Sequence, residues 1–303
     1  MNSNQWFHRR GELSGDGWES VVDSDLPGWE HTGIRVAQLS NGAVTAGATD
    51  VERMVVPLEG SFTVSFTEHG EDATVELAGR ASVFDGPTDV QYVPSGTAVT
   101  IVGTGRVAVA ESPTTVVRAS CRIERADVAV ELRGAGRSSR QVHNFGVPGA
   151  LDAERLIVCE VITPAGNWSS YPAHKHDEYI PGHESRLEEI YYFEAATAKG
   201  ADAPPAARPF GLFSTSSSPA GEIDTNAQVR SGDIALVPFG YHGPAVAAPG
   251  YDLYYLNVMA GPDTERAWRI SDDPAHAWVR DSWTAERIDE RLPYGPPKKD
   301  DDL

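Results

Sequence analysis

Short segments rich in β-branched and aromatic residues recur along the whole chain, and turn-forming residues separate them. Clear examples are residues 55–66, 97–110, 154–163, 189–194 and 252–259, and the chain contains 29 glycines and 21 prolines. Many short strands joined by such turns are typical of sandwiches and barrels. Helical periodicity is weak until residues 263–292, where we expect one or two short helices. The sequence therefore predicts an all-β protein.

A faint internal repeat indicates that the chain has two similar halves. The stretch Tyr92-Val93-Pro94-Ser95-Gly96-Thr97-Ala98 resembles Leu236-Val237-Pro238-Phe239-Gly240-Tyr241-His242. The second copy ends in a histidine, where the first copy has Ala98. A change of composition at residues 133–139, rich in Gly, Ala, Ser and Arg, indicates the junction between the halves.

Four residues of the second half predict a metal site. His174 and His176 are one residue apart, so on a strand both side chains point to one face while Lys175 points to the other. A carboxylate from the next strand, Glu189, and an imidazole from a later strand, His242, complete a set of nitrogen and oxygen ligands. Such a set suits one divalent ion, Zn, Mn, Fe, Ni or Co, and leaves coordination positions open for water or substrate.

The stretches around these residues resemble the two motifs of the cupin superfamily. One motif is H-x-H followed by E, and the other is G-x5-P-x-G followed shortly by H, as in Gly232 to His242. The chain departs from the pattern in two places, because residues 177–188 lengthen the gap before the glutamate and only Tyr241 separates Gly240 from the last histidine. The longer gap predicts a loop, residues 177–188, that overhangs the pocket.

The cupin resemblance favours Glu189 over two neighbouring glutamates, Glu188 and Glu184, as the carboxylate ligand. Glu189 begins an apolar strand, as the cupin glutamate does, whereas Glu188 would lie on the opposite face and Glu184 lies in the loop. The first half contains no H-x-H. The resemblance therefore implies a bicupin, with two tandem double-stranded β-helix (jelly-roll) barrels and minor helices near the C-terminus. Residues 1–135 would form a degenerate, metal-free barrel, and residues 136–303 the metal-binding barrel.

Longer stretches resemble one family within the cupins, the 5-deoxy-glucuronate isomerases of inositol catabolism, which are related to 5-keto-4-deoxyuronate isomerase. The matching stretches are Tyr171-Pro172-Ala173-His174-Lys175-His176-Asp177, Leu187-Glu188-Glu189-Ile190-Tyr191-Tyr192-Phe193, Val237-Pro238-Phe239-Gly240-Tyr241-His242 and residues 250–262, with weaker matches at Arg80–Phe84, Tyr92–Pro94 and Arg140–Asn144. The similarity spans most of the chain, from about residue 15 to residue 285.

The resemblance implies an intramolecular oxidoreductase, an aldose-ketose isomerase that converts 5-deoxy-glucuronate to 2-deoxy-5-keto-gluconate. A metal that chelates two adjacent oxygens polarises the carbonyl and stabilises an enediolate. If a proton moves, a base must lie near the C–H bond, and the candidates are Asp177, Tyr191 and Tyr255. The carboxylate of this small anionic sugar acid requires a cationic partner, for which the candidates are Arg140, Arg155 and Arg186.

Two other functions are compatible with the same ligand set. A metal-dependent bicupin dioxygenase would consume O2 and an aromatic substrate, although the absence of a metal site in the first half weakens this reading. A non-catalytic sugar-binding cupin would bind its ligand without turnover, but open coordination positions argue against a purely structural metal.

Charge and cysteine content limit the partners and the compartment. The formal net charge of −19 repels phosphate backbones and argues against nucleic-acid binding. No apolar run approaches the roughly 20 residues of a membrane helix. We expect Cys121 and Cys159 to be buried thiols in a reducing cytoplasm. A homo-oligomer is compatible with these features.

Overall fold

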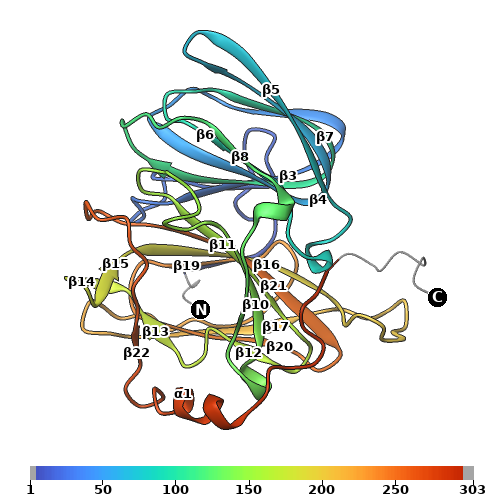
Figure 1. Ribbon diagram of the computed structural model, residues 1–303, viewed down its shortest axis with the longest axis vertical. Helices are drawn as coiled ribbons and strands as arrows, with labels where there is room; N and C mark the ends of the chain where they lie inside the picture. Colours follow the sequence, from blue (N-terminus) through green and yellow to red (C-terminus); the bar gives the residue numbers. More distant parts are fainter. Residues whose placement is uncertain (1–4, 296–303) are drawn as a thin grey trace.

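In the computed structural model, which describes residues 5–295, nearly all regular structure is β-strand, and the strands form an upper and a lower group (Figure 1). The all-β prediction is confirmed. The upper group is one seven-stranded sheet with the order β2-β3-β7-β4-β6-β8, and β5 pairs with β4. Its strands are β2 (Ser20–Val22), β3 (Gly33–Ala46), β4 (Val51–Glu68), β5 (Glu71–Arg80), β6 (Val90–Val93), β7 (Val99–Pro113) and β8 (Cys121–Ile123).

The lower group contains two larger sheets. The first has the order β1-β19-β16-β21-β11-β10-β9. Its strands are β1 (Phe7–His8), β9 (Val130–Arg133), β10 (Arg140–Gly146), β11 (Ile157–Thr163), β16 (Glu188–Thr197), β19 (Ile234–Val237) and β21 (Tyr251–Ala260). The second has the order β18-β17-β20-β13-β22, and β12 pairs with β20. Its strands are β12 (Trp168–Ser169), β13 (His174–Lys175), β17 (Gly211–Ser216), β18 (Asn226–Val229), β20 (Tyr241–Ala247) and β22 (Ser271–Asp272).

The first and last strands of the first half, β1 and β9, belong to the lower group, whereas the strands between them belong to the upper group. β1, at the start of the chain, pairs with β19, and β9 forms the far edge of the same sheet. The predicted division into residues 1–135 and 136–303 stays a prediction, and residues 296–303 of its second part lie outside the described residues.

Helices are few and short. The predicted C-terminal helices are confirmed as α1 (Val279–Ser282) and η4 (Trp283–Ala285), and three more single turns are η1 (Val83–Asp85), η2 (Arg125–Asp127) and η3 (Gly136–Ser138). Among residues 5–295, no helix has the length and apolar character needed to cross a membrane.

The two cysteines differ in their surroundings. Cys159 is buried on β11, but Cys121 is exposed. The expectation of two buried thiols is therefore wrong for Cys121, because it begins β8, the outermost strand of the upper sheet.

Three apolar clusters follow from the alternation of side chains along the strands. One cluster fills the upper group, another lies between the two large sheets of the lower group, and the third contains residues of both groups and lies between them. On β16, Tyr191 and Phe193 belong to the lower cluster, whereas Ile190 and Tyr192 belong to the shared one. One face of this strand therefore lines the lower interior, and the other packs against the upper group.

Buried carboxylates also connect the two groups. Glu52 on β4 accepts hydrogen bonds from the backbone N–H groups of residues 154–156, at 2.7–2.9 Å. In the opposite direction, Glu188 on β16 accepts hydrogen bonds from the N–H groups of residues 30–32. Arg80 on β5 forms two hydrogen bonds of 2.7 Å with Glu160 on β11. These buried contacts of Glu52, Glu188 and Glu160 therefore hold the two groups of strands together.

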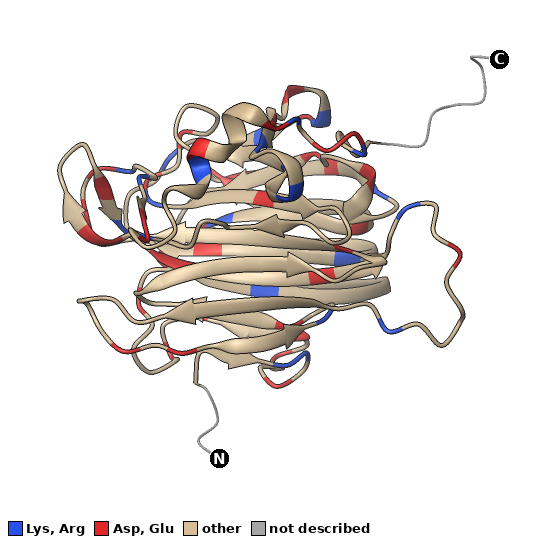
Figure 2. Ribbon diagram, turned by 90° about the horizontal axis from the view of Figure 1, so that it is seen from below, with Lys and Arg blue, Asp and Glu red and all other residues tan. Residues whose placement is uncertain are grey.

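Most of the remaining charge lies in loops and at strand ends, while most of the strand length is uncharged (Figure 2). The net charge of −19 is thus carried mainly by the loops and strand ends, where it favours solubility.

Candidate metal centre

The predicted metal ligands, far apart in the sequence, meet inside the lower group. His174 lies on β13 and is the register partner of His242 on β20, so both come from the same sheet. His176 follows β13 by one residue, and Glu189 lies on β16 of the facing sheet. The ligand nitrogens of the three histidines lie within 4.8 Å of one another, and all three side chains are buried.

Backbone carbonyl groups orient two of the imidazoles. His176 donates from Nδ1 to the carbonyl oxygen of Leu187, and His242 donates from Nδ1 to that of Gly240, each over 3.1 Å. A carbonyl oxygen can only accept, so Nδ1 carries the proton in both rings and Nε2 faces the centre. Each Nε2 approaches Oε2 of Glu189, at 2.9 Å from His176 and 3.0 Å from His242.

The pKa shifts of His174 and Glu189 suit a cation. Burial lowers the pKa of His174, and the two neighbouring imidazoles lower it further, so this ring is neutral. Burial alone would raise the pKa of Glu189, but its close contacts with His176 and His242 lower it to about 2. Burial would lower the pKa of His176, but Glu189 raises it. The cluster therefore combines an ionised carboxylate with imidazole nitrogens.

One unsatisfied atom indicates that the cluster fits a metal ion. His242 Nε2 is fully buried, and although it lies close to Glu189 it makes no hydrogen bond. A buried polar atom without a partner is unfavourable unless a bound group supplies one. Three buried histidines that present nitrogen toward one point could hold a metal ion.

The two neighbouring glutamates are engaged elsewhere. Glu188 points to the upper group and binds the N–H groups of residues 30–32, as described above. Glu184 accepts a hydrogen bond of 2.7 Å from Nζ of Lys175. Among the three glutamates considered from the sequence, only Glu189 lies beside the histidines.

A cavity of about 230 Å³ adjoins the histidine cluster. It is lined by Arg133, Arg140, Val142, Val161, Ser170, His174, Glu189, Tyr191, Tyr255, Asn257, Trp268, Ile270 and Arg280. None of residues 177–188 lines it. The expectation of an overhanging 177–188 loop is therefore wrong, because those residues form the hairpin of β14 (Asp177–Ile180) and β15 (Glu184–Arg186), and residues 268–280 contribute to the lining instead.

Two of the three catalytic candidates, Tyr191 and Tyr255, face this cavity. The hydroxyl of Ser170 lies 3.2 Å from the hydroxyl of each tyrosine, so the three groups form a short hydrogen-bonded chain. Burial raises the pKa of both tyrosines, that of Tyr191 well above its ordinary value. Both phenols therefore keep their protons near neutral pH and act as hydrogen-bond donors.

The third catalytic candidate, Asp177, does not line the cavity. Its carboxylate accepts hydrogen bonds from Lys175, from Ser218 and from the N–H of Gly240. Burial would raise its pKa, but these donors lower it, so Asp177 is ionised. Asp177 therefore connects the β13 segment to the turn before His242.

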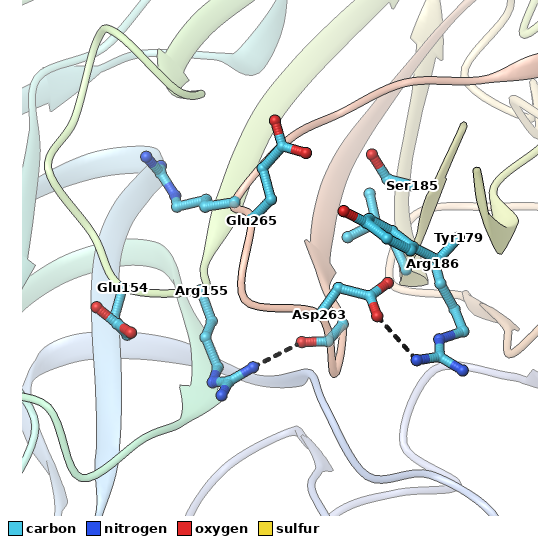
Figure 3. Close-up of a pocket in the computed structure, with 10 residues that line it drawn as sticks. Glu154, Arg155, Tyr179, Ser185, Arg186, Asp263 and Glu265 are labelled. Atoms are coloured by element: carbon cyan, nitrogen blue, oxygen red, sulfur yellow. Dashed lines mark hydrogen bonds and ion pairs between the residues drawn. The ribbon is translucent and has the colours of Figure 1, made fainter. Parts of the chain in front are cut away.

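The structure also separates the three arginine candidates. Arg140 lines the cavity beside the histidines. Arg155 and Arg186 lie together in a different, narrow pocket, where Arg155 donates to the carbonyl oxygen of Gly261 and Arg186 pairs with Asp263 (Figure 3).

Several cavity residues were missed by sequence reasoning. Arg133, Trp268 and Arg280 come from a sheet edge and from the C-terminal segment, and no motif marks them. Ser170 directly precedes the matched stretch that begins at Tyr171, and this position was the one signal in the sequence that could have indicated it.

Comparison with known proteins agrees with this geometry. Residues 7–279 match the model of the KduI/IolB family. A 5-deoxy-glucuronate isomerase of Geobacillus thermodenitrificans is 37% identical over 270 residues, which cover 88% of this chain and 92% of that protein. A 5-deoxy-glucuronate isomerase of Listeria innocua is 37% identical over 82% of this chain and 87% of that protein.

Two solved structures resemble this chain, one in sequence and fold and the other in fold. The crystal structure of an IolB-like protein from Salmonella typhimurium superimposes with a TM-score of 0.79 at 33% identity and covers 90% of this chain and 98% of that one. An oxalate decarboxylase of Lactobacillus farciminis, crystallised with formate, has a TM-score of 0.61 at 10% identity and covers 90% of this chain and 89% of its own. The second likeness concerns the fold alone.

Proposed function

The chain belongs to the KduI/IolB family, and we propose that it is a metal-dependent isomerase that converts 5-deoxy-glucuronate to 2-deoxy-5-keto-gluconate. The observation that carries the proposal is the buried cluster of His174, His176, His242 and Glu189, which opens onto a cavity of about 230 Å³. The curated relatives named as 5-deoxy-glucuronate isomerases support the choice of substrate. Bacterial inositol catabolism in the cytoplasm is the setting that we infer.

We propose that the three histidines and Glu189 hold one divalent Zn, Mn, Fe, Ni or Co ion. When bound, such an ion polarises a carbonyl and stabilises negative charge on adjacent oxygens. The protein itself orients two of the imidazoles, because the carbonyl groups of Leu187 and Gly240 hold His176 and His242 with Nε2 directed toward the centre of the cluster.

The isomerisation moves two hydrogens between adjacent positions of the substrate. The C2–H bond breaks as a C1–H bond forms, and the proton on O2 is lost as O1 gains one. Tyr191 and Tyr255 keep their protons, so we propose that one of them at a time donates a hydrogen bond to these oxygens and that neither removes hydrogen from carbon.

The hydroxyl chain has the proton count for such a transfer between oxygens. Tyr191, Ser170 and Tyr255 carry three hydroxyl protons, and their two mutual hydrogen bonds use two of them. One proton is therefore left to donate into the cavity, and reversal of the chain moves that donor from one tyrosine to the other. We propose Asp177 as a positioning residue, since it binds the N–H of Gly240.

We further propose that residues 1–135 and 136–303 form two tandem cupin barrels, of which only the second binds metal. The shared cluster of apolar residues and the carboxylates of Glu52 and Glu188 would then be the contacts between barrels.

A paired measurement on one sample tests the function. Metal content is measured by elemental analysis, and conversion of 5-deoxy-glucuronate is followed by NMR before and after chelation. We expect about one metal per chain and turnover that chelation abolishes and metal restores, with equal rates in air and under nitrogen. Metal without turnover would refute the assigned substrate, and O2-dependent turnover would favour a dioxygenase.

A further inference from the structure

We propose that Arg140 forms the anion subsite of the cavity and binds the carboxylate of a sugar acid whose other end faces the histidine cluster. The inference rests on the proposed function for the identity of the substrate, but the subsite itself is built from the contacts of Arg140. In this proposal, Arg140 makes the protein bind acidic sugars in preference to neutral ones.

Arg140 is a buried guanidinium that lacks an anionic partner. Arg140 lies on β10 and its side chain lines the cavity. The residue is 8% exposed. It donates one hydrogen bond, from Nη1 to the carbonyl oxygen of Ser138 over 3.0 Å, and its guanidinium lies 5.4 Å from the ring centroid of Trp283. No carboxylate among residues 5–295 forms an ion pair with it, which contrasts with Arg80 and its two-oxygen contact to Glu160.

The other two arginines of the cavity are already paired. Arg133 lies 2.7 Å from Glu131, and Arg280 holds both oxygens of Asp272. Each of these two arginines therefore already has a carboxylate partner. Arg140 is therefore the cavity arginine that is free to bind a ligand anion.

The electrostatic surroundings agree with this role. Burial, together with the charges of Arg133 and Arg280, lowers the pKa of Arg140 to about 10, although Tyr255 and Glu131 oppose this shift. Arg140 remains charged near neutral pH. A buried charge without a partner costs free energy, and a bound carboxylate would remove that cost through two charge-assisted hydrogen bonds.

The position of Arg140 also gives the ligand a direction. The cavity contains Arg140 and the metal-ligand candidates His174 and Glu189 in one continuous lining. Within the lining, Glu189 is the single carboxylate, and it is engaged by His176 and His242. A ligand with a carboxylate at one end and neutral oxygens at the other therefore matches the cavity in one orientation, with its carboxylate on Arg140.

Binding of an unreactive pair of sugars tests the subsite in the metal-loaded protein. L-Gulonate is glucuronate with its aldehyde reduced, so it cannot isomerise, and D-glucitol replaces the carboxylate by a neutral alcohol. By calorimetry we expect the unmodified protein to prefer gulonate, and Arg140→Gln to weaken gulonate binding about 10- to 100-fold. Glucitol binding and metal content should stay the same. Arg186→Gln, which alters an arginine of the other pocket, serves as the matched control.

The melting temperature and the binding of the two sugars together distinguish a ligand-binding role of Arg140 from a structural one. Arg140→Gln removes an unpaired buried charge, so its melting temperature should be equal to or above that of the unmodified protein. Gulonate preference that survives Arg140→Gln, or no preference in the unmodified protein, would overturn the proposal. A lower melting temperature with equal loss of both sugars would assign a structural role instead. The isomerase proposal fails separately, if gulonate binds through Arg140 but 5-deoxy-glucuronate is not converted.

Discussion

Replacement of Glu160 by glutamine should destabilise the protein by disrupting the buried charges between the two groups of strands. Both oxygens of Glu160 bind Arg80, and they also accept hydrogen bonds from Tyr254 and from His143, at 2.7 Å and 2.6 Å. The Arg80 side chain is 1% exposed and that of Glu160 is 0% exposed. Glu160→Gln leaves the guanidinium buried without its counter-charge.

The loss of stability can be calculated from the pKa of Glu160 and, independently, from the usual cost of breaking a buried ion pair. Burial would raise the pKa of Glu160, but Arg80 and His143 lower it from 4.5 to about 2, and this difference corresponds to about 3 kcal/mol of stability. Removal of one partner from a buried ion pair costs about 3–5 kcal/mol. We therefore expect Glu160→Gln to lower the free energy of unfolding by about 3–4 kcal/mol near neutral pH.

The dependence of this effect on pH has a defined sign. The pKa of Glu160 is lower in the folded state, so its contribution is fully present above pH 4.5 and is lost as the pH falls toward about 2. The glutamine variant has no such group to protonate. The difference in unfolding free energy between the two proteins should therefore shrink over this range.

Urea unfolding at neutral pH and at about pH 3 measures both quantities. Glu71→Gln is the control, since Glu71 is exposed at the start of β5. A loss under about 1 kcal/mol at neutral pH, or a difference that stays constant with falling pH, would refute the reasoning about Glu160.

Three further predictions concern the site. His242→Ala should lose bound metal and turnover while circular dichroism stays unchanged, and full metal occupancy would remove His242 from the ligand set. Ala98→His should leave metal content at its original value, because the first half lacks the other ligands, and a second metal per chain would contradict the metal-free first half. A Cβ atom at Gly243 would lie 1.9 Å from the carbonyl oxygen of Ser170, so Gly243→Ala should weaken metal binding and slow turnover by about tenfold or more. Gly250→Ala is its control, because Gly250 has a similar positive φ but open space around it, and equal losses in both variants would attribute the effect to the backbone alone.

The cluster of buried histidines could be predicted because its pattern is local. The spacing of His174 and His176 requires only that the segment be extended, and the structure has both side chains buried beside His242. The strands could be predicted for the same reason, from short apolar runs between glycines and prolines. Their pairing was beyond this reasoning, since the addition of β1 to β19 depends on packing between residues more than 200 positions apart.

The choice among arginines shows what a single sequence lacks. Arg140, Arg155 and Arg186 were equivalent candidates, and each is a cation near a matched stretch. Their difference lies in partners that the fold supplies, because Gly261 and Asp263 engage Arg155 and Arg186 whereas no carboxylate within residues 5–295 forms an ion pair with Arg140. A free charge is defined by the absence of a partner, and that property appears only when the distant segments are in place.

The choice between Glu188 and Glu189 was possible because a strand has a period of two. On β16, Glu189 and Tyr191 face the cavity, while Glu188 and Tyr192 face the upper group of strands. A shift of one residue in register would bury Glu188 among the histidines and direct Glu189 toward the backbone of residues 30–32. The same alternation therefore positions the metal-ligand candidate and the carboxylate that joins the two groups, so errors in register are opposed both by packing and by these buried charges.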